Sequence, residues 1–263
     1  MDKEEFLRFF EENEDRFIPG IYNYCDRWCE RCPFTSKCSV FAMEEKDEKG
    51  NNVENDLRSN EFWNKMGDVM TLTMELIMDM AEEHEIDLNE LDKEDFKKER
   101  VKLEQKADSH ILAKLSRKYI DVNRLWFENN EKAIEEKQKE FQKKAELNIT
   151  PEKTEKEFLK MSDYMEVIQW YTFQIHIKIK RALMNGDPNP EYEDFIQNDM
   201  NGSAKVALVG VERSISGWSG IFQNFPEQED EILNLLVMLE KIRNGIQKTF
   251  PDVHKFIRPG FDE

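Results

Sequence analysis

The four cysteines of the chain fall within fourteen residues, and this cluster constrains the N-terminal fold more than any other feature. Three, two and five residues separate successive members of the set, which is Cys25, Cys29, Cys32 and Cys38. Loops this short close into disulfides under strain, and a reducing compartment keeps such thiols free. We therefore predict that the four thiolates converge on one metal centre.

Iron–sulfur clusters and zinc ions both accept four cysteine thiolates, so both remain open for this centre. Structural zinc sites usually combine two Cys-x-x-Cys pairs across a longer loop, whereas clusters often take ligands from one compact run near a proline. The compact run here, with Pro33 inside it, favours a 4Fe–4S cluster over a zinc ion. Arg27, Arg31 and Lys37 stand among the ligands, and such cations favour the thiolate form.

Two partial resemblances concern the same loop. The spacings from Cys29 to Cys32 and Cys38 are similar to those of the iron–sulfur loop in helix-hairpin-helix DNA glycosylases of the endonuclease III type. That resemblance implies a 4Fe–4S cluster and no more, because no glycine-rich hairpin followed by a catalytic Lys and Asp accompanies it. The run from Cys25 to Cys32 also resembles the radical-SAM signature, but that family needs a parallel β/α barrel, and no series of apolar strands follows.

The acidic composition limits the partners of the chain. Lys and Arg number 38 against 56 Asp and Glu, and the formal net charge of -18 repels phosphate backbones and anionic lipid. No apolar run approaches the roughly 18 residues that a membrane helix needs, and the acidic first residues are unlike a signal peptide. We expect a cytoplasmic protein that binds neither nucleic acid nor membrane.

Apolar residues recur with a helical period along most of the remaining chain. We predict an all-α protein, an antiparallel helical bundle of about five to six helices with an N-terminal four-cysteine metal-binding loop. One predicted apolar face, assigned to a core, contains Trp63, Met66, Met70, Ile77 and Met80. The helices are expected over 3–16, from 59 to about 84, over 92–146 and 151–185, and over 203–224 and 228–249.

Some segments are less uniform. Residues 172–180 also alternate with period two, so a strand stays open there beside the preferred helix. The end of the helix over 92–146 carries few apolar residues, and we expect it to project into water.

The predicted organisation is an N-terminal helix and cysteine loop at 1–43, an exposed loop at 44–58, a helical bundle at 59–250 and an extended surface tail at 251–263.

Histidines and carboxylates are the candidate ligands for a second metal site. The Glu-x-x-His pairs of di-iron bundles are absent, because no Glu stands three residues before any of the four histidines. Polar residues in or beside apolar stripes could still form a divergent site, and Glu212 is expected to be buried and paired. The candidates are His84, Asp108, His110, Glu166, His176 and Glu212.

Three functions follow as hypotheses. The first is a metal-binding helical protein whose centre is structural, redox-active or sensing. The second is an oxidoreductase that uses the second metal site or a cofactor in the bundle. The third is an interaction scaffold that binds a protein through the charged helix around 128–160. Nucleophile-elbow, phosphate-loop and dinucleotide-binding motifs are absent, so an enzymatic activity stays open without support from them.

Overall fold

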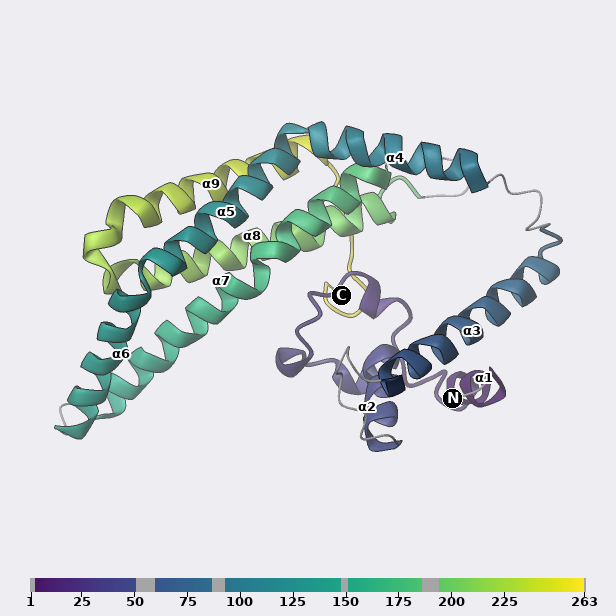
Figure 1. The fold of residues 1–263 in the computed structure, drawn as a ribbon, viewed down its shortest axis with the longest axis horizontal. Helices are drawn as coiled ribbons and strands as arrows, with labels where there is room; N and C mark the ends of the chain where they lie inside the picture. The colour runs from purple at the N-terminus through teal and green to yellow at the C-terminus, as the bar shows by residue number, and fades with distance from the viewer. Residues whose placement is uncertain (1–2, 51–59, 87–92, 148–150, 186–193, 263) are drawn as a thin grey trace. The chain divides into compact units, whose positions relative to one another are not determined.

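The computed structural model describes residues 3–50, 60–86, 93–147, 151–185 and 194–262, and these ranges contain helices and turns but no strand (Figure 1). The predicted all-α class is confirmed. Residues 172–180 lie within one long helix, α7 (Pro151–Asn185). Ile175 and Ile179 are buried in it, while Phe173 and Ile177 are exposed. The period-two pattern therefore arises from two pairs of residues spaced four apart on different faces of a helix.

The chain divides into two compact units. Unit 1 comprises Met1–Arg100 together with Pro259–Glu263, and unit 2 comprises Val101–Arg258. The helices of unit 1 are α1 (Lys3–Glu11), α2 (Ser39–Gly50), α3 (Asn60–Glu83) and the first part of α4 (Lys93–Ser109). None of the described helices of either unit is long and apolar enough to cross a membrane.

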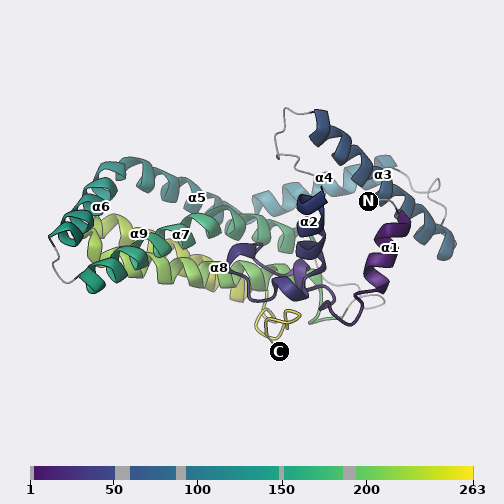
Figure 2. The same cartoon turned by 90° about the horizontal axis from the view of Figure 1, so that it is seen from below.

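The helices of unit 2 pack along their lengths, as Figures 1 and 2 show. Besides α7 they are α5 (Ile111–Asn129), α6 (Glu131–Glu146), α8 (Asp199–Ile221) and α9 (Glu229–Thr249). The closest approach joins α7 and α8. A Cβ atom placed on Gly217 would stand 2.9 Å from Cγ1 of Ile168, and one on Gly210 would stand 3.0 Å from Cδ1 of Tyr171. Small residues on α8 thus allow α7 to pack closely against it.

The segment 92–146 was predicted as one helix, and that prediction is wrong. Helix α5 begins after His110, whose Nδ1 accepts a hydrogen bond from the Leu112 amide at 3.2 Å. Helix α5 ends at Asn130, whose side-chain amide donates to the Trp126 carbonyl at 2.9 Å. Side-chain capping interrupts the helix where neither proline nor glycine does.

The end of this segment also differs from the expectation of a helix that projects into water. Helix α6 packs on α7. Phe141 of α6 is buried, and its ring centroid lies 5.8 Å from that of Phe158 on α7. The contact between Phe141 and Phe158 therefore belongs to the packing of α6, a helix with many charged residues, against α7.

Three other predictions need correction. Residues 44–50 belong to α2 instead of a loop, and residues 51–59 lie outside the described residues. The described apolar residues of the α3 face, Met66, Met70, Ile77 and Met80, are exposed instead of buried in a core. The tail is not wholly on the surface, because Val253 and Phe256 are buried and residues from Pro259 onward belong to unit 1.

Candidate metal centre

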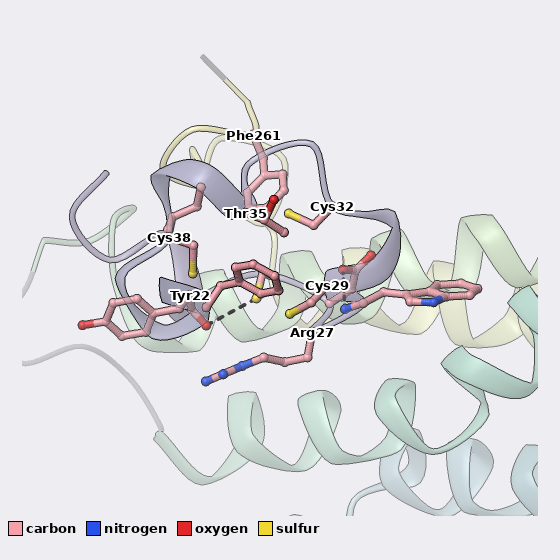
Figure 3. Close-up of a pocket in the computed structure, with 12 residues that line it drawn as sticks. Tyr22, Arg27, Cys29, Cys32, Thr35, Cys38 and Phe261 are labelled. Atoms are coloured by element: carbon pink, nitrogen blue, oxygen red, sulfur yellow. Dashed lines mark hydrogen bonds between the residues drawn. The ribbon is translucent and has the colours of Figure 1, made fainter. Parts of the chain in front are cut away.

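All four cysteines line one pocket of unit 1. In Figure 3 the sulfur atoms of Cys29, Cys32 and Cys38, which come from separate parts of the loop, face the same space. The four residues are free thiols. The other lining residues are Ile21, Tyr22, Asp26, Arg27, Trp28, Thr35, Phe41 and Phe261.

Short 3₁₀ turns bring the thiols to this pocket. One turn spans Cys29–Arg31, and the amide of Cys32 donates to the carbonyl of Cys29 at 3.1 Å. A second spans Thr35–Lys37, and the amide of Cys38 donates to the carbonyl of Thr35 at 3.2 Å. Because each turn reverses the chain within three residues, cysteines two and five residues apart can face one space.

A backbone hydrogen bond between the two ends of the loop closes it. The amide of Ile18 donates to the carbonyl of Lys37 at 3.0 Å. This bond joins the segment before Cys25 to the residue immediately before Cys38. The first and last thiols of the motif therefore belong to one closed loop.

The sulfur of Cys32 accepts a hydrogen bond from the backbone, and the thiol of Cys25 donates one to the carbonyl of Tyr22 at 3.5 Å (Figure 3). The amide of Phe34 donates to Sγ of Cys32 at 3.4 Å. The amide of Arg27 bonds to the Cys25 thiol, and Arg27 takes a left-handed conformation, with φ 57°. Each amide donor stands two residues after its cysteine. Amides directed at sulfur orient metal-bound thiolates and spread their charge.

Two of the thiols have pKa values above the ordinary value of a cysteine. Burial raises the pKa of Cys25 and, together with the nearby Glu44 and the other three thiols, raises the pKa of Cys29. The amide and charge of Arg27 oppose this effect at Cys25. The sequence indicated that cations favour the thiolate here, but burial outweighs them at these two residues. Bound metal would replace the protons and relieve the mutual repulsion of the sulfurs.

The cavity among the lining residues is small. Its volume is about 20 Å³, room for about one water molecule. In the part of the chain that the structure describes, no three His, Cys, Asp or Glu side chains are close enough to hold a single ion. Four sulfurs on one zinc ion each lie about 2.3 Å from the metal, so a zinc site would require the loop to contract.

The candidates for a second metal site have other roles in the structure. His110 caps α5, and Nδ1 of His176 lies 2.9 Å from Oγ of Ser116. His84 and Glu166 are exposed. Glu212 was expected to be buried, and it is exposed on α8, because the apolar stripe beside it faces the other way. Asp108 forms an ion pair with Lys180 at 2.6 Å.

Sequence reasoning found the four thiols of the pocket but missed its aromatic wall. Trp28 is 5% exposed, and the guanidinium carbon of Arg31 lies 4.0 Å from the centroid of its ring. Its position between two cysteines was a usable signal. Phe261 lies at the far end of the chain, and no pattern in the sequence connects it to the cysteines.

Comparison of the chain with known protein families, with curated proteins and with solved structures finds no match.

Proposed function

We propose that this chain is a metal-binding protein in which Cys25, Cys29, Cys32 and Cys38 together hold one 4Fe–4S cluster or one zinc ion. The observation that supports the proposal best is the convergence of all four thiols on one pocket. The amide hydrogen bond to the sulfur of Cys32 adds to it, since an amide donor favours the charged ligand form.

A structural role for the centre is supported by the small core of unit 1. Among the described residues of that unit, the buried apolar side chains are Ile21, Trp28 and Ala81. Ile21 and Trp28 both line the cysteine pocket. A unit with so little buried apolar surface needs a further source of stability, and a metal centre supplies it by binding the folded state only.

The spacing of the cysteines favours a 4Fe–4S cluster over a zinc ion. The four cysteines form one compact run with Pro33 inside it, an arrangement more typical of clusters than of structural zinc sites. A bound cluster would supply one-electron chemistry, and so a redox or sensing role besides the structural one. With zinc, the centre would be structural only, because four thiolates leave no open coordination position.

The architecture of unit 2 and the cellular location of the protein are part of the same proposal. We take unit 2 to be an antiparallel bundle, supported by the packing of α5, α7, α8 and α9 on one another. We take the protein to act in the cytoplasm, where four free thiols persist and are available to a metal.

Substitution of single ligands tests the proposal. Replacing Cys29 or Cys32 by Ser is expected to remove the metal and to lower the thermal stability of unit 1, because each thiolate is a direct ligand. The matched control is Ser36→Ala, which changes an exposed residue of the same loop outside the pocket lining. Metal content is measured by elemental analysis per chain. Equal metal content in Cys29→Ser, Cys32→Ser and the control would refute a four-thiolate centre.

A further inference from the structure

The last residues of the chain form part of the wall of the cysteine pocket. Phe261 lines the pocket together with the four cysteines, and Pro259–Glu263 belong to unit 1 although they end the chain. Figure 3 shows the Phe261 ring beside Thr35 and Cys32. The N-terminal motif therefore depends on the C-terminus for one of its sides.

Packing holds Phe261 in this position. Its ring centroid lies 5.1 Å from that of Phe34, with the planes at 79°, an edge-to-face arrangement. Phe34 is also the residue whose amide donates to Sγ of Cys32. The contact between Phe261 and Phe34 thus connects the C-terminal tail to the backbone amide that is hydrogen-bonded to Cys32.

Gly260 allows the tail to approach the pocket. Its φ of 75° is left-handed, and a Cβ atom would stand 2.9 Å from Cδ1 of Ile18 and 3.1 Å from Cδ1 of Ile21. Ile21 lines the same pocket. The turn at Gly260 therefore seats the tail against the apolar side of the loop.

We propose that Phe261 is a positioning residue that covers the thiols and so controls how fast water, oxidants and chelators reach the metal centre. The metal part of this inference rests on the proposed function. A phenyl ring offers no ligand atom, so its contribution is to exclude solvent. The apolar shell around a metal site controls solvent access, and outer contacts of this kind change metal retention by about tenfold or more when removed.

The test compares Phe261→Ala with Ile257→Ala, a control on the same tail whose side chain is 49% exposed. In the first arm, the metal-free reduced proteins react with iodoacetamide, and mass spectrometry follows each cysteine. We expect alkylation of the pocket cysteines to be about tenfold faster in Phe261→Ala than in the wild type or in Ile257→Ala.

In the second arm, the proteins are loaded with metal without oxygen and then exposed to air and a chelator. We expect equal metal content at the start and a loss about tenfold faster in Phe261→Ala. Phe261→Leu, which keeps an apolar cover, should give intermediate rates in both arms. Circular dichroism verifies that each variant retains its helices.

The proposed metal centre and the proposed role of Phe261 can be refuted independently of each other. A wild type that takes up no metal would refute the metal centre, and the alkylation arm would still decide whether Phe261 covers the thiols. Equal alkylation rates in Phe261→Ala and in the wild type would refute the proposal that Phe261 covers the thiols. Should Phe261→Ala lose its helices, the comparison of Phe261→Leu with the wild type decides, and equal rates would again overturn it.

Discussion

Gly260 is the residue whose backbone makes the return of the tail possible. Replacing Gly260 by Ala is expected to destabilise unit 1 by about 1–2 kcal/mol, because an L-residue at φ 75° is strained and its Cβ would press on Ile18. Chemical denaturation measures the effect. The control is Gly67→Ala on α3, where a Cβ meets nothing within 4 Å and helix propensity predicts a gain of up to about 1 kcal/mol. Equal effects at both sites would contradict the strained turn.

His176 makes the stability of unit 2 depend on pH. Burial, with the charges of Arg117 and Lys180, lowers the pKa of His176 from its ordinary value of 6.5. The unfolded chain then takes up a proton at higher pH than the folded chain, so stability is full above 6.5 and falls as the pH drops below it. In His176→Gln, the loss of unfolding free energy between neutral and acid pH should be smaller. The same slope in both proteins would assign the pH dependence to other groups.

At single residues, the sequence predicted some roles and concealed others. The cysteines were identifiable, because thiol chemistry and spacing point to a shared site. The caps His110 and Asn130 were not, since their function depends on a helix boundary that periodicity does not mark. Glu212 was misplaced, because a charged residue inside an apolar run can still point outward from a helix.

At the scale of elements, the contact between α7 and α8 is the most sensitive to side-chain size. Gly217→Ala is expected to lower the free energy of unfolding by about 1–3 kcal/mol. The added methyl would stand 2.9 Å from Ile168 and 3.1 Å from the backbone carbonyl of Tyr164, which cannot easily move. Ser219→Ala, an exposed change on the same helix, serves as control in denaturant titration. A loss in the control as large as that in Gly217→Ala would argue against the close contact.

Periodicity predicted the existence of most helices more reliably than it predicted which of their faces are buried. Helices α7 and α9 lie close to the predicted ranges, since their apolar residues are buried along one side. The pattern on α3 identified its apolar residues but not their exposure, because burial depends on another element covering them. Pro151 marks the start of α7, whereas side-chain caps divided the segment before it.

At the scale of the whole molecule, the two units differ in how they are stabilised. Unit 2 contains most of the buried apolar side chains of the described chain. Of the three in unit 1, Ile21 and Trp28 line the cysteine pocket. Hydrophobic burial can hold unit 2 folded by itself. Unit 1 is expected to depend on the proposed metal centre.

Metal removal should therefore affect one unit only. Stripping the metal with a chelator is expected to lower the melting temperature of unit 1 by roughly 10–20 °C, as follows from losing about 3 kcal/mol of binding free energy in a small unit. The melting of unit 2 should stay unchanged. Differential scanning calorimetry before and after chelation measures both transitions. A chelator that lowers both equally would show that the metal stabilises more than unit 1.

The division predicted from the sequence, into 1–43, 44–58, 59–250 and 251–263, did not place the last residues with the N-terminal unit, because their return to unit 1 is a long-range contact. No local pattern relates Phe261 to the cysteines. The sequence identified the donor atoms of the candidate site, and the structure adds their amide hydrogen bonds, their burial and their cover.

The most direct test of the metal centre is elemental analysis with an absorption spectrum, on full-length protein purified without oxygen. Iron, zinc and acid-labile sulfide are counted per chain. One metal group per chain is expected. About four irons with sulfide and a broad band near roughly 400 nm would identify a cluster, and one zinc without colour would identify a structural site. Protein that contains neither metal, and binds neither when it is supplied, would contradict the account.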